Sequence, residues 1–272
     1  MFLKSYLEGI LAYVRAIKMV KEHKLYLYFI VPIAFIVLVQ YSGSQIFDQL
    51  KEINIGFIYE VEYLDLNSNQ LQNILYFALN LLLVFILINF WSYIVLFCMI
   101  PLNTFMSMKT DSILTTNKFP FSWPQLLEDI KRSAIIIFRN MVIWLLLVFA
   151  IQLLMDVLIS VTAVKELDYI NLVAIQLVGF YFYGYSLMDY TLERFRMSVE
   201  ESNVFVWKNK FLAMGVGTVY GLMFQIPHIG NYVGVILGPI LGVIAATIAL
   251  HKVMDLSSNK FVKTTKEQTV RE

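Results

Sequence analysis

Two pairs of polar residues in this sequence have the chemistry to bind an anion within a membrane. Arg139 and Asn140 lie just inside a long apolar run that begins at residue 134, and His228 and Asn231 lie in the link between two later apolar runs. Guanidinium, imidazole and amide groups all offer N–H donors, and the first also carries a fixed positive charge. Because ionisable groups inside a bilayer are costly, they are candidates for function. We therefore predict these four residues to be anion or pore contacts.

Each pair also has a purely structural interpretation. An arginine near the end of a membrane helix commonly extends to the lipid headgroups, which would place Arg139 outside any pore. His228 and Asn231 can instead satisfy backbone groups of a turn between helices. The residues alone leave these alternatives open.

A group of charged residues follows the fourth apolar run. Its members are Asp189, Glu193, Arg194 and Arg196. Opposite charges at a helix end can fix the geometry of a loop, and ion pairs of this kind are ordinary at interfaces. We interpret the group as candidate cytoplasmic ion pairs.

Signals of catalysis are absent from the sequence. The three histidines are far apart, no paired metal-ligand spacing occurs, and no glycine-rich loop ends in a phosphate-binding lysine. We predict no enzymatic activity, no metal, no cofactor and no nucleic-acid partner.

The elements that must position these residues are membrane helices. Hydrophobic residues make up 59% of the 272 and charged residues only 15%. The hydrophobic residues are clustered into long runs that the core of a soluble protein would not need. The apolar runs cover residues 25–41, 74–100, 134–164, 167–188, 211–226 and 232–250. The sequence predicts an all-α integral membrane protein with a single membrane domain over residues 1–251 and a polar tail at 252–272.

The first 24 residues have a different pattern. Polar residues recur at helical spacing and leave apolar residues such as Leu3, Leu7 and Leu11 on the opposite face. This pattern predicts an amphipathic helix that lies in the membrane interface.

The last two apolar runs favour a tight helical hairpin. Small residues recur at four-residue spacing, which lets helix backbones approach closely in lipid; the glycines are Gly217, Gly221, Gly234, Gly238 and Gly242. The run 211–226 is about 24 Å long as a helix, shorter than the ~30 Å hydrocarbon core. A re-entrant hairpin and two full crossings are both compatible with the sequence, and the short first run favours re-entry.

The basic residues predict the orientation. Of the 21 lysines and arginines, 19 lie before residue 25, in 102–139, in 189–210 or after residue 250. Basic residues accumulate on the cytoplasmic side. Both termini are therefore predicted to be cytoplasmic, with residues 42–73 outside.

Several short segments resemble a known family. They are DYTLER at 189–194, KFLAMG at 210–215, IPHIGN at 226–231, GP at 238–239 and AAT at 245–247. In order and spacing they resemble the CysZ sulfate permeases and the etoposide-induced protein family, and the likeness covers most of the chain.

The resemblance implies an all-α membrane fold with two long spanning helices, partly penetrating helical hairpins and assembly into homo-oligomers. It implies a bacterial inner-membrane channel or permease for a small, sulfate-like anion. The permeases carry paired arginines before the first hydrophobic helix, where this chain has the uncharged Leu27 and Tyr28. The alternative is a membrane scaffold that does not transport and that organises partners or lipids.

Overall fold

The structure is a computed structural model that describes residues 2–41, 90–115, 123–162, 164, 166–195 and 197–254. In this part of the chain all regular elements are helical, which confirms the predicted all-α fold. The labelled elements are α1 (Phe2–Glu22), η1 (Leu25–Phe29), α4 (Ile100–Thr115), α5 (Trp123–Thr162), α6 (Leu167–Leu192), η2 (Glu193–Phe195), α7 (Val199–Lys208), α8 (Lys210–Phe224) and α9 (Gly230–Val253). Helical structure also continues from η1 to Tyr41, and the helix Phe90–Cys98 precedes α4.

The helices are long and apolar enough for a multi-pass membrane protein. Three of them can cross a bilayer by length and composition, or up to five segments if each of two bent helix pairs forms one span. At 15 residues, α8 is about 22 Å long and falls short of the ~30 Å hydrocarbon core. The predicted hairpin 211–250 corresponds to α8 and α9, which are joined by residues 225–229.

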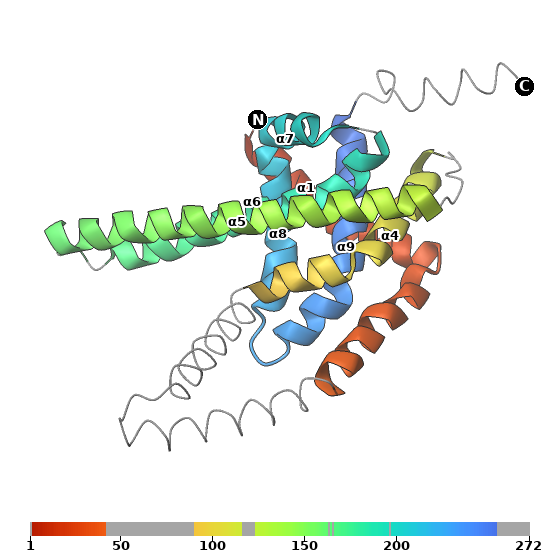
Figure 1. Cartoon of the computed structure of the whole chain (residues 1–272), viewed down its shortest axis with the longest axis horizontal. Coiled ribbons are helices and arrows are strands. Elements are labelled where there is room, and N and C mark those ends of the chain that lie inside the picture. The colour runs from red at the N-terminus through yellow and green to blue at the C-terminus, as the bar shows by residue number, and fades with distance from the viewer. Residues whose placement is uncertain are drawn as a thin grey trace, which may run out of the picture.

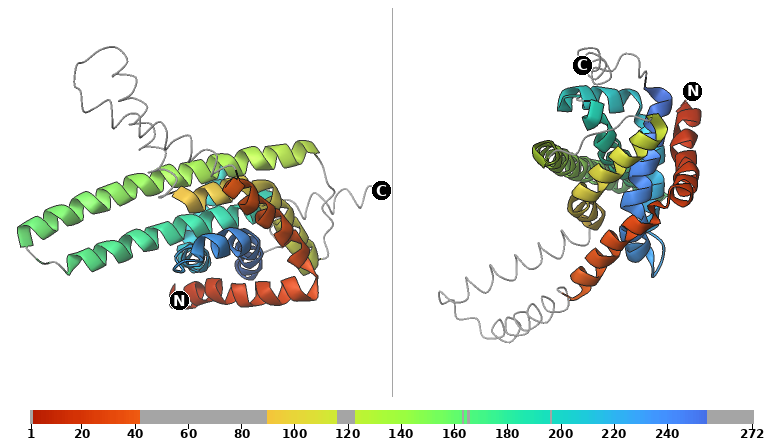
Figure 2. Two further views of the ribbon diagram at one scale, coloured as in Figure 1. Left: turned by 90° about the horizontal axis from the view of Figure 1, so that it is seen from below. Right: turned by 90° about the vertical axis from the view of Figure 1, so that its right-hand side faces the viewer.

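The N-terminal helix α1 has a buried face of small residues and an exposed face of large apolar residues. Small residues such as Gly9, Ala12 and Ala16 are buried, whereas Leu3 and Leu11 are 70% and 50% exposed. Figure 2 shows α1 alongside α8 and α9, and the following helix leaves it at a bend of 105°. An outward-facing leucine stripe suits a helix that lies in the interface with this face toward lipid.

One ionic contact ties α1 to the end of α9. Arg15 and Lys252 both donate to the carboxylate of Glu8. These hydrogen bonds lower the pKa of Glu8 to about 2, so the carboxylate is charged at any physiological pH.

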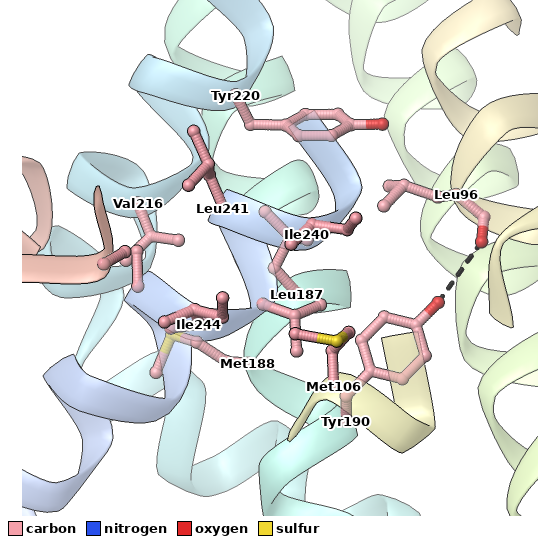
Figure 3. Close-up of a cluster of buried hydrophobic side chains, with 14 of the residues drawn as sticks. Leu96, Met106, Leu187, Met188, Tyr190, Val216, Tyr220, Ile240, Leu241 and Ile244 are labelled. Carbon is pink, nitrogen blue, oxygen red and sulfur yellow. Dashed lines mark hydrogen bonds between the residues drawn. The ribbon is translucent and has the colours of Figure 1, made fainter. Parts of the chain in front are cut away.

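Helix α9 is the centre of the packing, and α5 is its periphery. In the most apolar 18-residue window, 83% of α9 is buried against 6% of α5. Figure 3 shows Ile240, Leu241 and Ile244 of α9 among side chains from neighbouring helices, with Tyr190 donating to the Leu96 carbonyl at 3.2 Å. In Figure 1, α5 and α6 run across the view, while α8 and α9 run up and down it.

Two of the predicted glycines allow close approach to other parts of the fold. A Cβ on Gly217 would lie 1.8 Å from the Phe180 carbonyl oxygen of α6, so α8 contacts α6 backbone to backbone. A Cβ on Gly242 would meet the δ carbons of Leu187, also in α6, at 3.0 Å.

The other three glycines make room for aromatic rings. Gly221 faces Phe180, Gly234 faces Phe224 and Gly238 faces Tyr220. The small-residue stripes thus serve the α6–α8 contact as well as the α8–α9 hairpin.

Candidate functional site

Helices α5 and α6 form an antiparallel pair, and this pairing positions Arg139. The hydrogen bonds Arg132–Asp189, Asn140–Ser186 and Gln152–Asn171 run along the pair in opposite chain directions. Residues 132 and 139 are two helical turns apart and therefore share the face of α5 that meets α6.

Arg139 lies half-buried against a tyrosine. Its Nη2 donates to the Tyr185 hydroxyl at 2.7 Å, and its guanidinium carbon lies 5.3 Å from the centre of the same ring. The Nε atom is buried and has no hydrogen-bond partner among the described residues. Within that part of the chain Arg139 also makes no salt bridge with a carboxylate.

Asn140 is fully buried beside it. Its Nδ2 donates to the Ser186 hydroxyl at 3.0 Å, and that hydroxyl donates to the Phe182 carbonyl at 3.0 Å. The amide oxygen faces Arg139 at 3.5 Å, too far for a strong hydrogen bond. Asn140 therefore ties α5 to α6, and most N–H donors of Arg139 have no strong acceptor among the residues that the structure describes.

Arg132, seven residues earlier, has a different environment. Its Nη2 contacts the Asp189 carboxylate at 3.0 Å and the Ser202 hydroxyl at 2.7 Å, and its Nη1 donates to the Met197 carbonyl. Asp189 is 1% exposed, so this is a buried ion pair. On one face of α5, one arginine is thus neutralised by a carboxylate and the other is held by a neutral phenol.

The remaining charged residues of the 189–196 group bind different partners. Glu193 accepts from the Ser133 hydroxyl at 3.3 Å, and Arg194 donates to the backbone carbonyls of Thr104 and Tyr190. Arg196 lies outside the described residues. Sequence reasoning missed Arg132 as the partner of Asp189, although its two-turn spacing from Arg139 placed it on the same helix face.

His228 and Asn231 lie at the α8–α9 turn and are exposed. His228 has a left-handed backbone, with φ at 65°. Both residues line a cavity of about 340 Å³, together with Gln40, Trp91 and Tyr232. Gln40 donates to the Tyr232 hydroxyl at 2.9 Å, which joins the turn to the end of the helix that follows η1.

The four predicted anion contacts therefore occupy two places. Arg139 and Asn140 contact α6, while His228 and Asn231 face residues 35–40 and Trp91. The structure therefore does not bring the two pairs together into a single site.

Leu27 and Tyr28 occupy the positions at which the permeases carry paired arginines, and here these side chains are uncharged. Leu27 is 60% exposed, and the Tyr28 ring packs against Phe105 with centroids 5.3 Å apart. Neither side chain supplies a positive charge at these positions.

Comparison with known proteins agrees with the resemblance noted in the sequence. Residues 12–233 match the family described as Sulfate transporter CysZ/Etoposide-induced protein 2.4. None of the curated proteins matches the chain. The family match covers most of the chain, including α4 to α8, Arg139 and the hairpin turn. The chain belongs to the sulfate transporter CysZ/etoposide-induced protein 2.4 family.

Proposed function

We propose that this protein is a channel or permease for a small, sulfate-like anion in the bacterial inner membrane. The family is that of a sulfate transporter, and the apolar helices suit a multi-pass protein. The distribution of basic residues supports cytoplasmic termini. We further propose a homo-oligomer, in which lipid and a second copy share the exposed face of α5.

The observation that carries the proposal is the environment of Arg139. A guanidinium has five N–H donors, and the hydrogen bonds at Arg139 are to the Tyr185 hydroxyl and, weakly, to Asn140. A carboxylate would neutralise the side chain, as Asp189 neutralises Arg132, but at Arg139 the strong partner is a phenol. Planar guanidinium donors match the oxygens of tetrahedral oxyanions in pairs, so a sulfate-like anion can supply the missing charge.

A half-buried position strengthens this binding without making it permanent. Charge-assisted hydrogen bonds gain strength where water is partly excluded. An anion that must pass through needs binding weak enough to allow release. Attachment to a single arginine, rather than to a cluster, meets that requirement.

The turn at His228 and Asn231 is the second proposed contact along the path. Its cavity of about 340 Å³ admits an anion together with several waters, and Asn231, which carries an amide donor, is among the residues that line it. This contact would act in series with Arg139.

Uptake into liposomes tests the proposal. Purified protein is reconstituted, radiolabelled sulfate is added outside, and accumulation is compared with that in empty liposomes, with phosphate and chloride as competitors. We expect saturable uptake that unlabelled sulfate suppresses. If no anion enters above the rate of empty liposomes, the scaffold hypothesis takes precedence.

A further inference from the structure

Lys210, the first residue of α8, is a second cation held by aromatic rings. Its Nζ lies 4.5 Å from the centre of the Trp207 ring and 5.7 Å from the centre of the Phe211 ring. It makes no salt bridge within the described part of the chain. The face of an aromatic ring attracts a cation but does not neutralise its charge. Lys210 therefore shares with Arg139 an aromatic partner and the lack of a carboxylate partner among the described residues.

Three aromatic side chains connect these two cations. Arg139 donates to the Tyr185 hydroxyl, and the Tyr185 ring centre lies 6.3 Å from that of Tyr181. Tyr181 meets the Trp207 ring edge-on, with centres 6.1 Å apart, and the Trp207 ring contacts Lys210. The charge of Arg139 also acts on Tyr181. These five residues form an aromatic strip that crosses α5, α6, α7 and α8, with a cation at each end.

An ion can reach the aromatic strip from outside the packed core. Trp207 is 61% exposed, and Arg139, Tyr181 and Lys210 are partly exposed. No member of the strip is an acid, and its tyrosine and tryptophan side chains carry O–H and N–H donors. The strip therefore combines two positive charges with neutral donors and has no negative charge of its own.

Two cations in succession suit an anion that has to move. Conduction requires binding that is weak enough for release, and several sites in a row achieve this. A second positive charge attracts the anion as it leaves the first. Lys210 belongs to the basic segment 189–210, which the sequence predicts to be cytoplasmic. Of the two cations, Lys210 is thus the one suited to the last contact before release.

We propose that Lys210 is the contact that a tetrahedral oxyanion occupies after Arg139 and before it enters the cytoplasm. This inference rests on the proposed function and adds a residue to its path. An ammonium group offers a compact charge without the paired donor geometry of a guanidinium, which suits release more than capture. The phosphate headgroup of an anionic lipid has the same chemistry as a free oxyanion, so the experiment has to separate the two.

Uptake of radiolabelled sulfate by liposomes that contain Lys210→Gln tests this inference. The maximal rate should fall about threefold or more, whereas the half-saturating sulfate concentration should stay within about twofold, because the substitution affects release and not capture. Lys210→Arg keeps the charge and should retain about half or more of the maximal rate. Lys208→Gln is the matched control, since Lys208 is an exposed cation of α7 outside the strip, and it should transport as the wild type does.

A second arm of the experiment varies the lipid. The effect of Lys210→Gln should be the same in phosphatidylcholine liposomes and in liposomes that also contain phosphatidylglycerol. An effect confined to phosphatidylglycerol would assign Lys210 to a lipid headgroup and overturn the inference. A wild-type maximal rate for Lys210→Gln, alongside impaired Arg139→Gln, would overturn the inference and leave the proposed function standing. Absence of sulfate uptake by the wild-type chain would overturn both.

Discussion

The crossing of α6 and α8 leaves no room for a side chain at Gly217, and Gly217→Ala should destabilise the fold. A Cβ at this position would lie 1.8 Å from the Phe180 carbonyl oxygen and 2.6 Å from the Gly184 nitrogen. Carbon–oxygen contacts between helices are normally about 3.3 Å or longer, so the helices must separate by about 1.5 Å. Both obstructing atoms belong to the backbone, and no rotamer change can relieve them.

The magnitude follows from two opposing effects. Overpacking a tight contact costs about 3 kcal/mol when the neighbours cannot yield. Alanine favours a helix over glycine by about 1 kcal/mol. The net loss should be about 2 kcal/mol in the free energy of unfolding, or a fall of about 4–8 °C in the thermal midpoint for a chain of this size.

SDS-induced unfolding followed by circular dichroism provides the assay. Gly179→Ala is the matched control on α6, because the nearest atom to its added Cβ is the Trp144 Nε1 at 3.3 Å, the end of a side chain that can shift. This variant should be neutral or slightly stabilising. Equal midpoints for Gly217→Ala and Gly179→Ala would refute the close backbone contact between α6 and α8.

Two further predictions concern charged groups. Arg132→Met should lower the free energy of unfolding by about 3 kcal/mol, because it leaves the buried Asp189 carboxylate without its partner. The exposed Lys18→Met should change it far less, and equal effects of the two in SDS titrations would contradict this account. Glu8→Gln should lower the thermal midpoint by an amount that is constant above about pH 4.5. Because the pKa of Glu8 falls from 4.5 to about 2 on folding, that difference should vanish as the pH drops through about 2; a difference that persists below pH 2 would exclude the ionic contact.

The sequence predicted the fold class through simple regularities. Long apolar runs, the helical spacing of polar residues in the first 24 positions, and the five glycines of the last two runs all correspond to features of the structure. These signals are local, because each depends on residues within a few helical turns.

The partners of the predicted residues could not be read in the same way. Glycine spacing indicates that some backbone approaches Gly217, but nothing near it in sequence identifies Phe180 of α6. Likewise, Asp189 lies 57 residues from Arg132, and only the α5–α6 pairing brings them together. Helical spacing predicts which side of its helix a residue occupies and whether that side is buried. The residue that it contacts depends on how the helices pack against one another.

The candidate site shows the same limit. The sequence predicted Arg139 to be a candidate anion contact but could not separate an anion site from an ordinary interfacial arginine. The structure adds Tyr185 as its partner and Asp189 as the partner of Arg132. Arg132 is paired with a carboxylate and Arg139 with a phenol, and this difference makes the role of Arg139 testable by substitution.

The most direct test of the central claim is sulfate flux through liposomes that contain Arg139→Gln. Loss of a charged hydrogen-bonding group at a binding site is worth about 1.5–3 kcal/mol, so flux at low sulfate concentration should fall at least tenfold. Arg139→Lys should retain an intermediate flux, since it keeps the charge but not the paired donors. Lys131→Gln, a change at an exposed cation on the same helix, is the control and should conduct as the wild type does. Wild-type flux through a correctly folded Arg139→Gln protein would contradict the proposed anion site.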